Sequence, residues 1–156
     1  MMPVHDRCRI EPAAPSHVAA LATRLRGADR DELEAAGIGP HKALWRSYRR
    51  STWARTAVIG DEVAAMWGCG GNPFGGVGRP WLLTGPEVEE MPLFFIRRAR
   101  AETAEMLGIY ARLWGYVDAR YQRALRLLTI CGFSLSETFP FGPAGAPFRR
   151  YEIGRH

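Results

Sequence analysis

The stretch YARLWGYVDARYQRALRLLTICGF, residues 110–133, decides the fold that we expect for this chain. By helix propensity alone it could form one helix, but Gly115 interrupts it, and the residues on either side of this glycine favour strands. We therefore predict a strand over 112–117 and a helix over 118–131. Asp118 carries a typical N-cap side chain, so we expect it to begin this helix.

The rest of the chain alternates between strand and helix patterns around this stretch. Gly132 is expected to end the helix as a left-handed C-cap, and Gly108 to end the helix before the stretch. Asp29 and Glu32 have the spacing of a capping box, so we interpret them as the start of a short helix. Strands are predicted over 7–11, 53–59, 62–69, 81–84, 134–139 and 148–153, and further helices over 16–26, 29–37, 40–50 and from between 87 and 93 to about 106. This order predicts an α/β (α+β) fold with helices on the faces of a mixed sheet.

The glycine-rich segment GGNPFGGVGRP, residues 70–80, has two interpretations. Closely spaced glycines expose backbone N–H groups and can cradle a phosphate. A phosphate loop runs from a strand into the N-terminus of a helix, whereas this segment runs from one predicted strand to the next. A flexible hairpin connection is therefore the favoured interpretation.

Length and composition indicate one domain, 1–156, with a basic surface. The net charge is +5 and the sequence pI is near 9.6. Such a surface could meet nucleic acid, the phosphates of coenzyme A or an acidic partner, although a solvated charged face is the favoured interpretation. No apolar run approaches the length of a membrane span, and the first residues lack the apolar core of a signal peptide, so we expect a cytoplasmic protein. Scattered histidines and three cysteines without CxxC spacing predict no metal site.

The order strand, helix, glycine, phenylalanine, strand resembles the C-terminal half of the acyl-CoA N-acyltransferase fold, called GNAT. The resemblance extends to the GNAT-like internal virion proteins of short-tailed bacteriophages and covers most of the chain from about Arg9. It rests on the order and spacing of EAAGIGP (34–40), AAMWGCGG (64–71), PWLLTGPEV (80–88), ARLWGYVDAR (111–120), LLTICGF (127–133) and FRRYEI (148–153). It implies a GNAT-like, largely antiparallel sheet of about 6–7 strands flanked by about 4–5 helices. It also implies a location in the virion, and in the host cytoplasm during synthesis.

The resemblance places a coenzyme A site beside the strand WLLT, residues 81–84. Working GNAT enzymes carry an Arg/Gln-x-x-Gly-x-Gly/Ala turn after this strand, which lets the backbone approach a diphosphate. Here the turn reads GPEVEEMP, 85–92, and its three carboxylates are expected to repel the diphosphate. The candidate cofactor contacts are Leu82, Leu83 and Thr84 on the strand, and Arg97, Arg98 and Arg100 in the following helix. Coenzyme A would pair with the strand backbone, one N–H of which would polarise the thioester carbonyl.

The catalytic side chains that the family implies are not evident in the sequence. The position of the family's general-acid tyrosine falls on Leu128, and that of its asparagine falls on Tyr121. Candidate general bases are Glu62, Glu102, Glu105, Asp118 and Glu137, none of which the pattern singles out, so no catalytic residue is assigned. The cleft beside WLLT is either open or plugged by side chains such as Phe94, Phe95 or Trp114.

Two functions compete on these observations. The main interpretation is a non-catalytic virion or assembly component that binds other virion proteins, such as portal, tail or internal core proteins, and lies near DNA through its arginine-rich surface. No cofactor is expected in that case. Aromatic residues suited to such an interface are Trp45, Tyr48, Trp53, Phe74, Trp81 and Phe141. The alternative is an N-acetyltransferase that uses acetyl-CoA to modify an amine.

Overall fold

The computed structural model describes residues 7–155 and confirms the predicted α/β fold. Six initial residues, on which the signal-peptide expectation partly rests, and His156 lie outside this range. The strands are β1 (Cys8–Pro12), β2 (Ser51–Ile59), β3 (Glu62–Asn72), β4 (Val77–Thr84), β5 (Arg112–Asp118), β6 (Ser134–Leu135), β7 (Phe139–Phe141) and β8 (Ala146–Gly154). The helices are α1 (Pro15–Ala22), α2 (Gly27–Ala35), α3 (Pro40–Arg50), α4 (Pro92–Ile109) and α5 (Gln122–Ile130). Within the described range, no helix is both long and apolar enough to cross a membrane.

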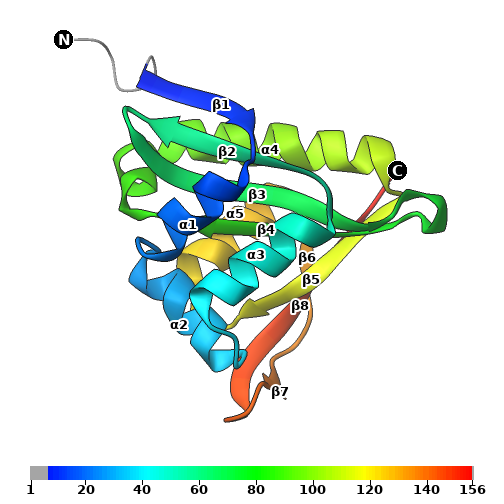
Figure 1. The fold of residues 1–156 in the computed structure, drawn as a ribbon. Coiled ribbons are helices and arrows are strands. Elements are labelled where there is room, and N and C mark those ends of the chain that lie inside the picture. The colour runs from blue at the N-terminus through cyan, green and yellow to red at the C-terminus, as the bar shows by residue number, and fades with distance from the viewer. Residues whose placement is uncertain (1–6, 156) are drawn as a thin grey trace.

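A single eight-stranded sheet forms the middle layer. Its strand order is β1-β2-β3-β4-β5-β8-β6, with β7 paired to β8, and its pairs are antiparallel except for β4 with β5. Figure 1 shows α1, α2 and α3 on one face of the sheet, with α4 and α5 on the other. The largely antiparallel sheet and the five helices agree with the expected architecture.

Each face of the sheet has its own apolar core. On the α4 face, the buried cluster consists of Ala57, Ala65, Trp67, Cys69, Val88, Met106, Tyr110, Leu113 and Phe133. On the face covered by α1 and α3, the buried cluster consists of Val18, Leu21, Ala22, Leu25, Leu44, Val63, Met66 and Leu83. β3 supplies residues to both clusters, as expected for a strand covered on both faces, whereas β4 supplies only Leu83, to the second.

The parallel strands β4 and β5 separate soon after they begin. They pair at Val77 with Arg112 and at Gly78 with Leu113, and at no later position. β4 remains paired with β3, and β5 with β8, along their lengths. A gap therefore opens between β4 and β5 toward their C-terminal ends, and unpaired backbone groups line it.

The helix after β5 begins later than predicted. Asp118 is the last residue of β5, and α5 begins at Gln122 with Tyr121 as its N-cap. The Asp118 carboxylate accepts a hydrogen bond of 2.9 Å from the backbone N–H of Arg120, so it caps the turn before the helix and not the helix. The predicted end is confirmed, because Gly132 has a φ of 97°.

Other boundaries also differ from the prediction. α4 continues through Gly108, because the glycine lies on an open surface while Met106 and Tyr110 beside it are buried. The single strand predicted over 134–139 is replaced by the short strands β6 and β7. The glycine-rich segment is confirmed as a hairpin connection, with the short 3-10 turn Pro73–Gly75 between β3 and β4.

Candidate active site

Thr84, at the end of β4, forms hydrogen bonds with α2 and with Arg26, the residue that precedes α2. Gly85 donates its N–H to Ala64 of β3 at 2.7 Å, so the backbone of the preceding Thr84 faces the gap. The N–H of Thr84 donates to the Asp29 carboxylate at 2.8 Å, and its hydroxyl donates to the same oxygen. Its carbonyl accepts the N–H of Arg26 at 2.9 Å. Thr84 is therefore saturated and has no backbone group left for a ligand.

A tyrosine from β8 crosses β5 and reaches the gap. The Tyr151 hydroxyl donates to the carbonyl of Pro80 on β4 at 3.0 Å. The side chain passes over Gly115, its partner on β5, where an added Cβ would lie 2.3 Å from the Tyr151 hydroxyl. Burial raises the pKa of Tyr151, and the negative charge of Glu32 adds to this rise, so the hydroxyl keeps its proton at neutral pH.

Leu82 remains as the open position on β4. Backbone alternation directs its N–H and C=O into the gap, as it does for Pro80 and Thr84 on either side. Among residues 7–155, no hydrogen-bond partner is found for these two groups. The Leu82 side chain is 41% exposed on the α4 and α5 face. Leu83, by contrast, is buried in the core beneath α1 and α3.

A carboxyl group from α2 approaches the wide end of the gap. Glu32 accepts the N–H of Asp118, the last residue of β5, at 3.3 Å. Burial raises the pKa of Glu32 to about 7, and the charges of Asp29 and Asp118 add to the rise. The Asp118 carboxylate itself is buried, but hydrogen bonds from Arg120 outweigh the burial and lower its pKa.

Asp29 and Glu32 thus do not form the predicted capping box. The N-cap of α2 is Arg26, and no side chain caps this helix end. One helical turn instead presents Asp29 to the end of β4 and Glu32 to the end of β5. These two carboxyl groups attach α2 to both strands that border the gap.

The acidic turn after β4 is surrounded by arginines. Residues Pro86–Glu90 form a 3-10 helix, in which Glu87 pairs with Arg24. Glu89 pairs with Arg26 at 3.3 Å and with Arg123 of α5 at 3.0 Å. The fold thus brings arginines to this turn from segments that are distant in sequence. These arginines therefore offset part of the repulsion that was expected for a diphosphate.

The three arginines of α4 do not reach this turn. Arg98 pairs with Glu102 of the same helix at 2.6 Å. Arg97 and Arg100 are exposed on α4. Positive charge at the turn comes instead from the α1–α2 connection and from α5. Both segments are far from the turn in sequence, so the sequence did not indicate them.

Four of the carboxylates considered as general bases lie away from the gap. Glu102 and Glu105 both bind Arg55 of β2, at 2.7 and 2.6 Å, and so hold α4 on the sheet. Glu62, the first residue of β3, forms an ion pair with Arg24 at 3.2 Å. Glu137 is exposed on the segment between β6 and β7. None of these four is placed to take a proton in the gap.

The side chains considered as plugs lie elsewhere. Phe94 and Phe95 pack on the core that contains Ile59 and Met91. Trp114 is on the α1–α3 face and stacks with arginines. Leu128 packs on the α4-side core, and the Tyr121 hydroxyl binds Arg26. The hydroxyl in the gap therefore belongs to a residue that the family pattern did not indicate.

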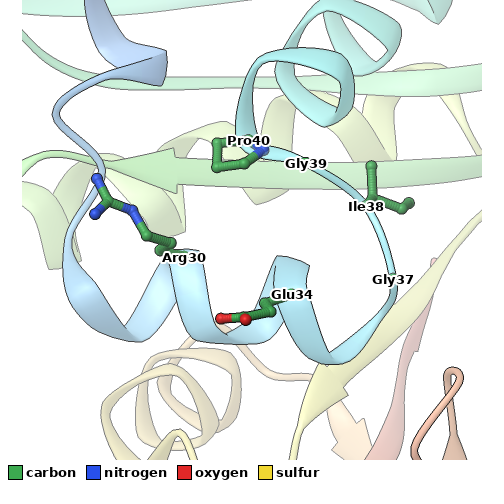
Figure 2. A pocket seen from close by; sticks show the side chains of 6 residues that line it. All are labelled: Arg30, Glu34, Gly37, Ile38, Gly39 and Pro40. Atoms are coloured by element: carbon green, nitrogen blue, oxygen red, sulfur yellow. The ribbon is translucent and has the colours of Figure 1, made fainter.

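Two surface hollows lie outside the gap. Figure 2 shows the first, of about 400 Å³, between α2 and the start of α3, lined by Arg30, Glu34, Gly37, Ile38, Gly39 and Pro40. The second, of about 260 Å³, lies beside the start of β2. Arg30 and Glu34 project from a flank of α2 other than the one that carries Asp29 and Glu32. Across residues 7–155, no three His, Cys, Asp or Glu side chains are grouped to hold a metal ion.

The structure resembles solved acetyltransferases over nearly its whole length, although the sequence matches no protein-family model and no curated protein. Spermidine N-acetyltransferase from Vibrio cholerae, in complex with CoA and spermine, matches with a TM-score of 0.70 and 12% identity over 96% of each chain. A GNAT-family acetyltransferase from Streptococcus pneumoniae has a TM-score of 0.65 and 15% identity, over 96% of this chain and 99% of that one. The chain has the GNAT acetyltransferase fold. AAC(6')-Ib, in complex with ribostamycin and coenzyme A, shares this GNAT fold with a TM-score of 0.69 and 13% identity, over 96% and 94% of the two chains.

The GNAT fold confirms one part of the predicted resemblance and corrects another. The interpretation as a non-catalytic virion component is wrong, because the similar structures are acetyltransferases and nothing among them indicates a phage or virion protein. The expectation of no cofactor also loses its basis, because several of these structures contain coenzyme A or acetyl-CoA. That interpretation rested on the phage resemblance, on the arginine-rich surface and on the acidic turn, whose arginine partners are distant in sequence.

Proposed function

We propose that this protein is an N-acyltransferase that moves an acetyl group from acetyl-CoA to an amine. The observation that carries the proposal is the gap between β4 and β5, into which Leu82 directs an unpaired N–H and C=O. An extended pantetheine arm can pair with the C=O as an added strand, which leaves the N–H to the carbonyl oxygen of the thioester. The exposed Leu82 side chain offers it an apolar floor.

The charge around the turn supports a diphosphate site there. Arg26 and Arg123 meet at Glu89, from the α1–α2 connection and from α5. A guanidinium binds phosphate oxygens as well as carboxylate oxygens, because both present paired acceptors. We assign these two arginines to the diphosphate, in place of Arg97, Arg98 and Arg100.

Glu32 and Tyr151 have complementary protonation properties for acyl transfer. Acetyl-CoA supplies a thioester, whose carbonyl carbon bonds to the amine nitrogen while its carbon–sulfur bond breaks. The Glu32 carboxylate, with a pKa of about 7, can accept the proton that the amine nitrogen loses. The Tyr151 hydroxyl holds a proton in the gap, where a departing thiolate requires one. The Leu82 N–H is the candidate donor to the carbonyl oxygen.

The test is acetyl transfer by the purified protein. The protein is incubated with acetyl-CoA and a panel of primary amines, and mass spectrometry detects any acetylated amine. We expect product with the wild-type protein and a loss of about a hundredfold or more in Glu32→Gln. Glu34→Gln, an exposed carboxylate on the same helix, is the matched control. Equal rates in Glu32→Gln and Glu34→Gln would show that Glu32 is not the general base.

A further inference from the structure

Two guanidinium groups stack on one tryptophan ring at the narrow end of the gap. Arg79 of β4 lies over the Trp114 ring with its guanidinium carbon 3.7 Å from the ring centroid. Arg150 of β8 also lies over this ring, at 4.2 Å. Positions 79 and 114 directly follow Gly78 and Leu113, the last pair of β4 with β5. The cluster of Arg79, Trp114 and Arg150 therefore marks where the two strands begin to separate.

This cluster lies on the α1–α3 face, opposite the exposed side chain of Leu82. Arg79 precedes Trp81 by two residues and so points to the same face as Trp81, which packs on the core beneath α1 and α3. Trp114 alternates with Leu113, which is buried in the α4-side core. Glu32 comes to the gap from α2, which covers this same face. One face thus holds a carboxyl at the wide end of the gap and a cationic cluster at the narrow end.

The two arginines of this cluster differ in their partners. Arg150 pairs with Glu152 at 2.9 Å, and Glu152 also binds Arg112 at 2.6 Å. Arg79 is exposed, and no carboxylate within residues 7–155 lies at ion-pair distance from it. The Trp114 ring holds the Arg79 guanidinium in place without neutralising its charge. Arg79 is therefore available to an anionic group of a ligand.

We propose that the acyl acceptor is an amine that also carries an anionic group, which Arg79 binds while the amine faces Glu32. This inference rests on the proposed function and names its substrate class. Trp114, which Arg79 contacts, and Asp118, which Glu32 contacts, are four residues apart on β5, roughly 13 Å. An acceptor with several carbon atoms between its amine and its carboxylate can contact both ends. A polyamine would place a second cation against Arg79, at an electrostatic cost.

Three acceptors of equal chain length test the inference: 6-aminohexanoate, hexylamine and 1,6-diaminohexane. They end in a carboxylate, a methyl group and a second amine, so acetylation rates isolate the effect of terminal charge. We expect kcat/KM for 6-aminohexanoate to exceed that for 1,6-diaminohexane about tenfold or more. In Arg79→Gln, the ratio of kcat/KM for 6-aminohexanoate to that for hexylamine should fall about tenfold. Arg79→Lys should retain part of this ratio, because it keeps the charge.

Arg126→Gln is the matched control, because Arg126 is exposed on α5 at the other face of the sheet. Its ratio should equal that of the wild-type protein. A preference for 1,6-diaminohexane, or equal ratios in Arg79→Gln and Arg126→Gln, would overturn the inference while leaving acyl transfer established. Absence of transfer to all three amines would overturn the proposed function, and the inference with it.

Discussion

Glu32 and Tyr151 approach the gap between β4 and β5 from opposite faces of the sheet. Glu32 belongs to α2 on one face and accepts the N–H of Asp118. Tyr151 crosses Gly115 on the α4 and α5 face and donates to Pro80. A carboxyl with a pKa of about 7 and a hydroxyl that keeps its proton thus flank one opening. This arrangement suits an acceptor and a donor that enter from different faces.

The raised pKa of Glu32 predicts a pH-dependent stability. Its pKa is 4.5 when unperturbed and about 7 in the folded protein, so folding favours the protonated form. The contribution of Glu32 to stability is largest below pH 4.5 and is lost as the pH rises to about 7. Glu32→Gln keeps an oxygen for Asp118 and removes the charge. Above pH 7 it should therefore be more stable than the wild-type protein, by up to about 3 kcal/mol.

Thermal unfolding at pH 5 and pH 8 measures this difference. The gain in Tm from Glu32→Gln should be small at pH 5 and larger at pH 8. Glu34→Gln should show no such change, because Glu34 is exposed. A gain that is the same at both pH values would mean that Glu32 is not the titrating group.

Tyr151→Phe should slow acyl transfer without weakening cofactor binding. The substitution removes the hydroxyl that donates to Pro80 and leaves the ring that packs edge-on against Phe133. We expect kcat to fall about a hundredfold, the lower end of the usual effect of a lost general acid, with an unchanged Kd for acetyl-CoA. Tyr116→Phe, in the aromatic cluster with Phe139, is the control. Wild-type kcat in Tyr151→Phe would exclude the hydroxyl from proton transfer.

Glu89 should compete with the cofactor for Arg26 and Arg123. Both ion pairs must open when the arginines bind a diphosphate. Glu89→Gln should therefore tighten coenzyme A binding by about fivefold, the range of a partly exposed ion pair. Glu90→Gln, in the same turn, should leave affinity near that of the wild-type protein, and titration calorimetry measures both. Pantetheine, which lacks the diphosphate, should bind the two variants equally, and tighter pantetheine binding to Glu89→Gln would point to another cause.

Two glycine substitutions should have opposite effects on stability. An alanine at Gly115 would place its Cβ 2.3 Å from the Tyr151 hydroxyl, so the tyrosine must move and lose its bond to Pro80. We expect Gly115→Ala to cost about 1–3 kcal/mol. Gly108→Ala should stabilise α4 by up to about 1 kcal/mol, because nothing lies within 4 Å of the new Cβ. Urea unfolding measures both, and a stable Gly115→Ala with wild-type kcat would place Tyr151 outside the site.

Local patterns predicted much of the fold because they depend on neighbouring residues. Gly115 was correctly placed inside a strand, and Gly132 at the end of a helix. The predicted start of that helix was wrong because an aspartate carboxylate accepts a backbone N–H in the same way whether it caps a turn or a helix. For Asp118, the choice was made by the pairing of β5 with β8, which extends the strand through this residue.

The site was harder to predict because its contacts join distant parts of the chain. Asp29 and Glu32 bind Thr84 and Asp118, which are 55 and 86 residues away, so their spacing alone could not distinguish a capping box from a bridge. A signal for the tyrosine was present: a glycine inside a strand often marks the close approach of another group. At Gly115 that group is the Tyr151 side chain.

The most direct test of the account is a crystal structure of the wild-type protein grown with coenzyme A. We predict that the pantetheine arm lies between β4 and β5 and bonds to the backbone of Leu82. The diphosphate should lie against Arg26 and Arg123, with Glu89 displaced from both. Coenzyme A bound elsewhere, or a gap that stays empty at millimolar coenzyme A, would contradict the account.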